Sequence, residues 1–241
     1  MPFTLAHPAA VLPIWAGGKP RLRLAALVLG AVTPDFEYFL HLNTVGRYAH
    51  SLPGLFFVCL PAGWLSLWLF DRFGRQGIAS LLPTTWQLPA PPTSPNRVLP
   101  TSVALLLGAA THVIWDAFTH ASGWGVALLP QLTDPALTSP ISIPWFKVLQ
   151  HGSTLLGLAV LAGACWKWMR RQPPVPILEL LRRTVVPGTV LAAAGVLNGL
   201  RFLPTSFQQF VVSGGVAVTL TLGLGLVLLG LFKAPSRASV G

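Results

Sequence analysis

Charged side chains are scarce in this chain. They make up 9% of its 241 residues, whereas a soluble domain has roughly a quarter. Only six residues are acidic and only two are cysteines, Cys59 and Cys165, each inside an apolar run. Two isolated cysteines form neither a disulfide framework nor a thiolate metal motif. These shortages argue against a soluble domain and against a cysteine-based metal site.

Apolar residues, at 53% of the chain, take the place of the missing charges. Six runs reach about the length of a membrane-spanning helix, roughly 18 residues. They are residues 22–40, 52–70, 99–121, 151–169, 185–203 and 209–232. A membrane β-barrel would instead alternate apolar and polar residues. The sequence predicts one all-α integral membrane domain over residues 1–241, a polytopic transmembrane helical bundle of about six spans. A short helix at 8–16 is expected to re-enter the membrane or lie at its interface.

The sixteen basic residues, which give a net charge of +10, lie between the apolar runs. Thirteen fall in alternate connections, and the other three, Arg47, Lys147 and Arg201, fall in the opposite set. The positive-inside rule then makes loop 71–98 cytoplasmic and loop 122–150 outward. Nucleic-acid binding would instead cluster the basic residues on a soluble face. The basic charge therefore indicates topology, and no nucleic-acid partner is expected.

The segment THVIWDAFTH, residues 111–120, ends the third predicted span and repeats an ionisable residue every four positions. Such residues are costly at membrane depth unless they are paired, so each one is a functional candidate. His112 and Asp116, four apart and about 6 Å along the axis, can converge on one metal ion. His120 lies about 12 Å from His112, which suits a second ion, an outer contact or proton transfer. Simple pairing of Asp116 with a histidine explains the pattern equally well.

Two further acids stand in TPDFEYFL, at the end of the first predicted span. Asp35 and Glu37 are two apart, so a regular helix would direct them to different sides. We predict Asp35 as an inward metal ligand and Glu37 as a general base or a group that supports a ligand. A helix start with Thr33 as N-cap and Pro34 next also explains both acids, because the helix dipole favours negative charge there.

Three more histidines fall on the predicted outer side. His50 directly precedes the second span, and His151 begins the fourth. His7 joins them if the chain reverses near residues 17–20. The residue numbers of facing positions in such an antiparallel hairpin add up to about 40, so His7 would lie level with Asp35. Each of these histidines could also be an ordinary residue of the membrane interface.

The motifs MPFTLAHPAAVLP, TPDFEYFL, HSLPGLF and THVIWDAFTH closely resemble those of a bacterial family of integral membrane proteins, the domain of unknown function 4184. More distantly, their order is similar to that of bacterial inner-membrane proteins described as metal-dependent hydrolases, which are likened to zinc-dependent phospholipases. That similarity implies an inner (plasma) membrane location, a second acid at Glu37 and a set of metal ligands. The matching ligand positions are His7, Asp35, His50, His112 and Asp116. This chain reads GRYAHS where that pattern has an additional His-Arg-Gly.

We therefore predict an inner-membrane protein with a divalent-metal site near the outer leaflet. Zinc is the simplest ion for mixed imidazole and carboxylate ligands. The expected activity is hydrolysis of a lipid or lipid-linked phosphoester, with membrane lipid as partner and Glu37 and His120 as catalytic candidates. The alternatives are an ion- or proton-coupled transporter and a structural membrane protein with a satisfied polar cluster. The few polar residues of the last two spans lie near the outside, which disfavours a path through the membrane.

Overall fold

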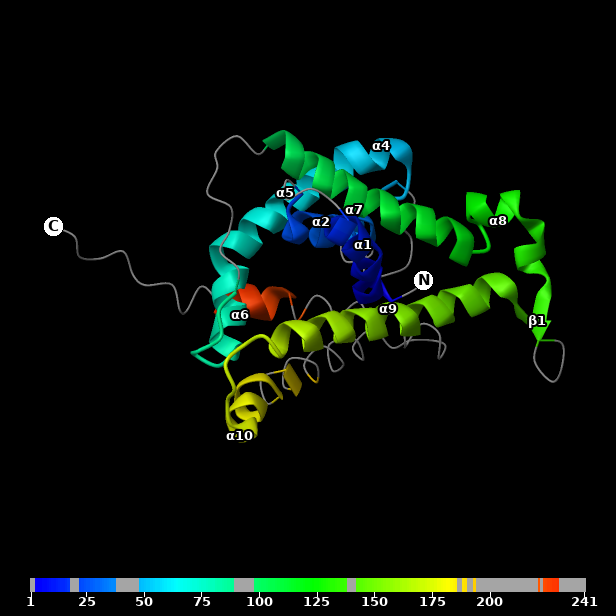
Figure 1. The fold of residues 1–241 in the computed structure, drawn as a ribbon. Coiled ribbons are helices and arrows are strands. Elements are labelled where there is room, and N and C mark those ends of the chain that lie inside the picture. Colours follow the sequence, from blue (N-terminus) through cyan, green and yellow to red (C-terminus); the bar gives the residue numbers. More distant parts are fainter. Residues whose placement is uncertain are drawn as a thin grey trace. The chain divides into compact units, whose positions relative to one another are not determined.

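The computed structural model describes residues 3–17, 22–37, 48–88, 98–137, 142–185, 188–189, 193, 221 and 223–229. Its residues form two compact units. The first unit comprises Met1–Glu37, Gly46–Trp64 and Ser94–Lys167, and the second comprises Tyr38–Val45, Leu65–Thr93 and Trp168–Gly241. Within the described residues both units are largely helical (Figure 1).

Seventeen elements follow one another along the described chain. The N-terminal part contains η1 (Thr4–Val11), α1 (Leu12–Gly17), α2 (Leu24–Gly30) and η2 (Thr33–Asp35). Next come α4 (Leu52–Gly54), η3 (Leu55–Cys59), α5 (Leu60–Leu69), η4 (Phe70–Gly74) and α6 (Arg75–Leu81). The remaining elements are α7 (Val98–Thr119), α8 (Trp124–Leu128), η5 (Pro130–Thr133), β1 (Pro135–Leu137), β2 (Ile143–Pro144), α9 (Trp145–Met169), α10 (Ile177–Leu180) and η6 (Leu181–Val185).

Within the described residues, three continuous helices are long and apolar enough to cross a membrane. They are Leu52–Leu81 with 30 residues, Val98–Thr119 with 22 and Trp145–Met169 with 25. Each contains most or all of one predicted span, so these three predictions are confirmed as helices of spanning length. The spans predicted at 185–203 and 209–232 lie largely outside the described residues. The structure thus supports a helical membrane protein, and the total of six spans stays a prediction.

The first predicted span, 22–40, is described only to residue 37, and this part is not one regular α-helix. The apolar helical stretch within it runs from Leu24 to Asp35, which is about 18 Å at 1.5 Å per residue and short of a bilayer core. Helix α2 itself ends at Gly30, and the chain continues through a turn into the 3-10 segment η2. Pro34 accounts for this change, because it has no N–H to continue the α-helical ladder.

The N-terminal helix predicted at 8–16 also takes a different form. It is a 3-10 helix, η1, that contains Pro8 and passes into the short α1. The Phe3 N–H donates to Thr154 Oγ1 of α9 at 3.1 Å, and Ala6 packs against Gly157 of the same helix. Figure 1 shows this segment, in dark blue, between α7 and α9.

Both predicted loops contain more helix than expected. Residues 71–81 of the predicted loop 71–98 are helical, because the second spanning helix continues as α6 to Leu81. It stops there since Pro83 follows, and a residue before proline disfavours helical geometry. The loop predicted at 122–150 contains α8, η5, the antiparallel β1–β2 pair and the first turn of α9. The side of the membrane on which each loop lies stays a prediction.

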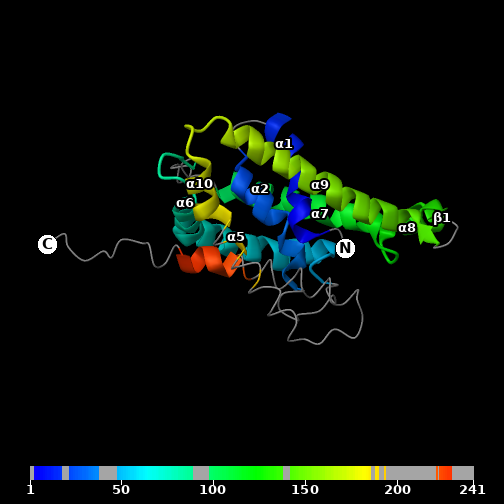
Figure 2. The same ribbon diagram turned by 90° about the horizontal axis from the view of Figure 1, so that it is seen from below.

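Helices α2 and α7 pack with their backbones in direct contact, side by side in Figures 1 and 2. A Cβ atom on Gly30 would collide with the Leu105 carbonyl, and one on Gly108 with the Leu27 carbonyl. Small residues permit such close approach between apolar helices. This contact brings the carbonyl-bearing C-terminal end of α2, at Ala31, against the middle of α7.

The close approach of α2 and α7 makes Gly108→Ala destabilising. The added methyl group must displace the Leu27 carbonyl, and such overpacking costs about 1–3 kcal/mol. Gly163→Ala in α9 is the matched control, because a Cβ at Gly163 meets nothing within 4 Å. Thermal unfolding in detergent should show a lower midpoint for Gly108→Ala only. Equal midpoints for the two variants would contradict this packing.

Candidate metal centre

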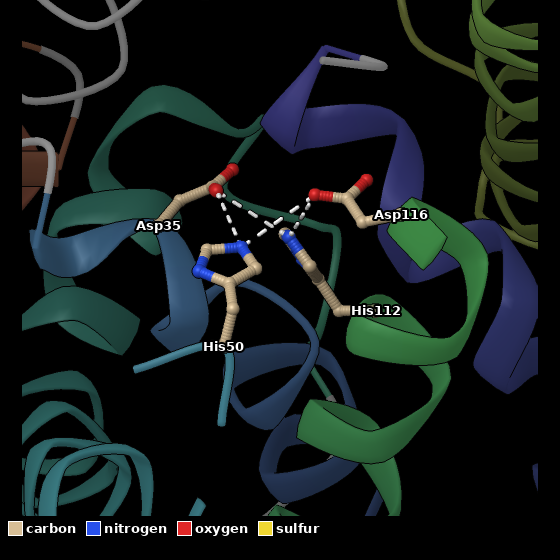
Figure 3. Close-up of side chains that lie close together, drawn as sticks. All are labelled: Asp35, His50, His112 and Asp116. Carbon is tan, nitrogen blue, oxygen red and sulfur yellow. Dashed lines mark ion pairs between the residues drawn. The ribbon is translucent and has the colours of Figure 1, made fainter. Parts of the chain in front are cut away.

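Four ionisable side chains of the first unit converge at one point (Figure 3). Asp35 ends η2, His50 lies in the turn before α4, and His112 and Asp116 stand one turn apart on α7. One nitrogen or oxygen atom from each lies within 4.8 Å of the other three. The structure therefore brings together four of the five predicted ligand positions, Asp35, His50, His112 and Asp116.

The His112 ring is fixed by a backbone contact. Its Nδ1 lies 2.7 Å from the Ala31 carbonyl, which can only accept, so Nδ1 carries the proton of that bond. Its Nε2 lies 3.3 Å from Asp35 Oδ1 and 3.4 Å from Asp116 Oδ2. A neutral ring thus directs a lone pair at two carboxylates, which is unfavourable unless a cation or a proton lies between them. Histidine metal ligands typically donate their other N–H to a carbonyl in this way.

Asp35 is held at the centre by the local 3-10 structure. Thr33 Oγ1 donates to the Gly30 carbonyl at 2.8 Å, which closes the turn between α2 and η2. The Asp35 carboxylate is fully buried, and its Oδ2 accepts a hydrogen bond from Thr4 of η1. Its Oδ1 makes no hydrogen bond within the described residues and faces His112 and His50. One oxygen is therefore engaged by the scaffold and the other by the cluster.

The turn that carries His50 is fixed from two sides. The Ala49 N–H donates to Glu37 Oε2 at 3.0 Å, and the Cys59 thiol lies 3.4 Å from the Ala49 carbonyl. Ser51 caps α4 by accepting from the Gly54 N–H at 3.1 Å. His50 Nε2 consequently lies 3.5 Å from Asp116 Oδ2 and 3.7 Å from Asp35 Oδ1.

His7 lies against the opposite side of Asp116. Its ring stacks on His112 with centroids 3.6 Å apart, and its Nε2 lies 3.5 Å from Asp116 Oδ1. Burial lowers the pKa of His7 below its ordinary value. Its Nε2 makes no hydrogen bond within the described residues.

His120 follows the last turn of α7 and lies at the edge of the cluster. Its Nδ1 donates to the Asp116 carbonyl at 2.9 Å and lies 3.7 Å from Asp116 Oδ1. Its side chain is 28% exposed, yet its Nε2 is buried and makes no hydrogen bond within the described residues. Burial lowers the pKa of His120 below its ordinary value. These contacts place His120 beside Asp116 and leave one ring nitrogen able to accept a proton.

The two carboxylates of the cluster need compensating positive charge, from a cation or from protonated histidines. Asp35 and Asp116 are both buried, and their ion-pair partners in the part of the chain that the structure describes are all histidines. Buried carboxylates are strongly disfavoured unless charge and hydrogen bonds compensate them. A divalent cation would balance two carboxylates and leave the histidines neutral.

The spacing of the donor atoms fits one small ion. Zinc binds imidazole nitrogen and carboxylate oxygen at about 2.0–2.2 Å, so adjacent donors of a tetrahedral site lie about 3.4 Å apart. Four of the six separations among Asp35 Oδ1, Asp116 Oδ2, His50 Nε2 and His112 Nε2 are 3.3, 3.4, 3.5 and 3.7 Å, and all six lie within 4.8 Å. The donor set, two imidazoles and two carboxylates with no thiolate, suits zinc or a similar divalent metal.

The remaining sequence candidates take other positions. Glu37 is engaged with the Ala49 backbone, so in the structure it supports the His50 turn. His151 is exposed on α9. The role of Thr4 was not anticipated, although a 3-10 helix offers a signal: residues three apart eclipse one another, so Thr4 and His7 share one side. The contact of the Ala31 carbonyl with His112 involves the backbone, so no side chain in the sequence indicates it.

The contact between Thr4 and Asp35 provides a test of the site's construction. Thr4→Val keeps the side-chain shape but leaves a buried carboxylate oxygen without its donor, which should cost about 1–3 kcal/mol. Thr4→Ser retains the hydroxyl and should stay close to wild type. Chemical unfolding in detergent measures the difference. If the Val and Ser variants were equally stable, the hydroxyl would have no part in holding Asp35.

Comparison with known proteins agrees with the motifs of the sequence. The family model described as "Domain of unknown function (DUF4184)" matches residues 1–234, so the chain belongs to this family. No curated protein and no solved structure matches the chain.

Proposed function

We propose that this protein is a membrane-bound, metal-dependent hydrolase that cleaves a phosphoester of a lipid or lipid-linked substrate. The observation that carries the proposal is the Nε2 atom of His112. It faces two buried carboxylates at 3.3 and 3.4 Å while its Nδ1 is engaged by a carbonyl. The proposed ligands are Asp35, His50, His112 and Asp116, with His7 as a further donor beside Asp116 Oδ1.

The composition of the donor set supports catalysis over a purely structural metal. Structural zinc sites are typically rich in cysteine, whereas catalytic sites use histidine and carboxylate ligands. The buried Cys59 contributes no thiolate to the donor set. Its thiol contacts the Ala49 carbonyl and supports the His50 turn. When bound, a divalent ion would polarise a phosphoryl oxygen and make water a better nucleophile at neutral pH.

The chain's own residues supply the proton chemistry. Asp116 directs Oδ2 toward the donor set and Oδ1 toward His7 and His120, so it can orient a water molecule at the edge of the cluster. His120 holds its Nδ1 proton against the Asp116 carbonyl, and its Nε2 remains a proton acceptor. We propose His120 as the general base, with Glu37 acting through the position of His50. The distant resemblance to metal-dependent hydrolases supports the same reaction class.

Metal content tests the first part of this proposal. Protein purified in detergent with zinc should retain bound metal, whereas His112→Ala and His7→Ala should each lose it, because each removes a donor. His151→Ala and Asp134→Asn are matched controls, since both residues are exposed and lie outside the cluster. Elemental analysis per chain gives the answer. If the cluster variants bind as much zinc as the controls, the cluster is not a metal site, and its side chains are stabilised by pairing with one another alone.

Hydrolysis of phosphatidylglycerol in mixed micelles tests the second part. His120→Gln should lower kcat by about 10²–10⁴-fold, the usual contribution of a general base, while the metal content stays that of wild type. His151→Gln serves as the control. Metal-loaded protein that releases no phosphate ester, yet moves zinc or protons across proteoliposome membranes, would instead identify a transporter.

A further inference from the structure

An apolar groove opens on the first unit beside the His/Asp cluster. It has a volume of about 250 Å³ and lies between the η1–α1 segment and helices α7 and α9. Ala10 and Pro13 line one wall, and Leu156 and Val160 line the other. These four residues are exposed, whereas His7, which also lines the groove, is buried. The groove therefore leads from the surface of the unit to the residue that faces Asp116.

The lining of the groove selects an apolar occupant. No charged side chain lines it among the described residues. The indole N–H of Trp115 already donates to Ser153 Oγ at 3.0 Å, and Ser153 donates to the Gln150 carbonyl at 3.2 Å. A polar ligand would find few free partners there, whereas a hydrocarbon gains by leaving water or by packing against the walls.

The surroundings of the groove indicate the source of that hydrocarbon. Both α7 and α9 are long and apolar enough to cross a membrane, so the exposed walls at Leu156 and Val160 face lipid when these helices do so. The volume is slightly below that of pockets for drug-sized ligands, about 300–1,000 Å³. This volume suits a segment of one hydrocarbon chain better than a whole lipid molecule.

We propose that this groove binds one hydrocarbon chain of a membrane phospholipid and so presents the phosphoester of that lipid to the His/Asp cluster. His7 joins the two parts, because it lines the groove while its Nε2 lies 3.5 Å from Asp116 Oδ1. The purpose given to the groove rests on the proposed hydrolase function. Its occupation by a lipid chain does not, and can be measured separately.

A photoreactive lipid tests the occupation. Phosphatidylglycerol that carries a diazirine near the end of one acyl chain is incorporated into proteoliposomes with the protein. The proteoliposomes are irradiated, and the labelled residues are then mapped. Lipid that merely surrounds the protein labels exposed residues such as Leu155 and Leu158. A chain inside the groove also labels Ala6 or His7, which are only 5% and 4% exposed.

Two tryptophan variants separate the groove from the general lipid surface. Ala10→Trp fills the groove with a large side chain and should abolish labelling at Ala6 and His7. Ala159→Trp introduces the same side chain at an exposed alanine of α9 that does not line the groove, and should leave the labelling intact. Unchanged labelling in Ala10→Trp, or labelling confined to exposed residues, overturns the inference. Cross-links from Ala6 or His7 to a second copy of the chain, in place of lipid, overturn it as well.

Metal content measured in the same samples distinguishes the two proposals. Ala10→Trp should retain its zinc, and His112→Ala, although it loses zinc, should still be labelled at Ala6 or His7. If the wild-type protein is labelled there but neither binds zinc nor hydrolyses phosphatidylglycerol, the groove stands and the proposed function fails. If it binds zinc and hydrolyses lipid without this labelling, the function stands and the groove fails.

Discussion

Two carboxylates, Asp35 and Asp116, are buried with only histidines as ion-pair partners within the described residues, and the first unit is organised around this constraint. A buried carboxylate needs compensating charge and hydrogen bonds. In the described residues these come from Thr4 and from a group of histidines that approach within 3.3–3.7 Å. These groups lie on η1, in the His50 turn and on α7, so the carboxylates hold η1, η2, the His50 turn and α7 together.

The scaffold meets this requirement by combining one regular helix with irregular backbone. His112 and Asp116 stand on α7, whereas His7 and Asp35 stand on 3-10 segments and His50 in a turn. Irregular backbone at membrane depth is tolerated where it is buried in protein or lines a cavity. The contact between Gly30 and α7 brings α2 close enough for the Ala31 carbonyl to fix the His112 ring. Close helix packing therefore sets the orientation of a candidate ligand.

The same arrangement relates the polar cluster to the apolar groove. Asp116 directs one oxygen toward the donor set and the other toward His7, and His7 lines the groove. The polar cluster and the apolar groove thus meet at one side chain, His7. For a substrate with a charged head and a hydrocarbon tail, this geometry would separate the two parts without a large movement of the chain.

The sequence by itself determined the features that depend on local spacing. Hydropathy predicted the helices of spanning length, and the four-residue interval predicted that His112 and Asp116 would face one point. The early end of α2, the helical course of residues 71–81, the contact of Thr4 with Asp35 and the fixing of the His50 turn by Glu37 came only from the tertiary structure. These features depend on 3-10 geometry, proline positions and backbone carbonyls from distant segments. Such contacts leave no periodic pattern in the sequence, because they arise when separate segments pack against one another.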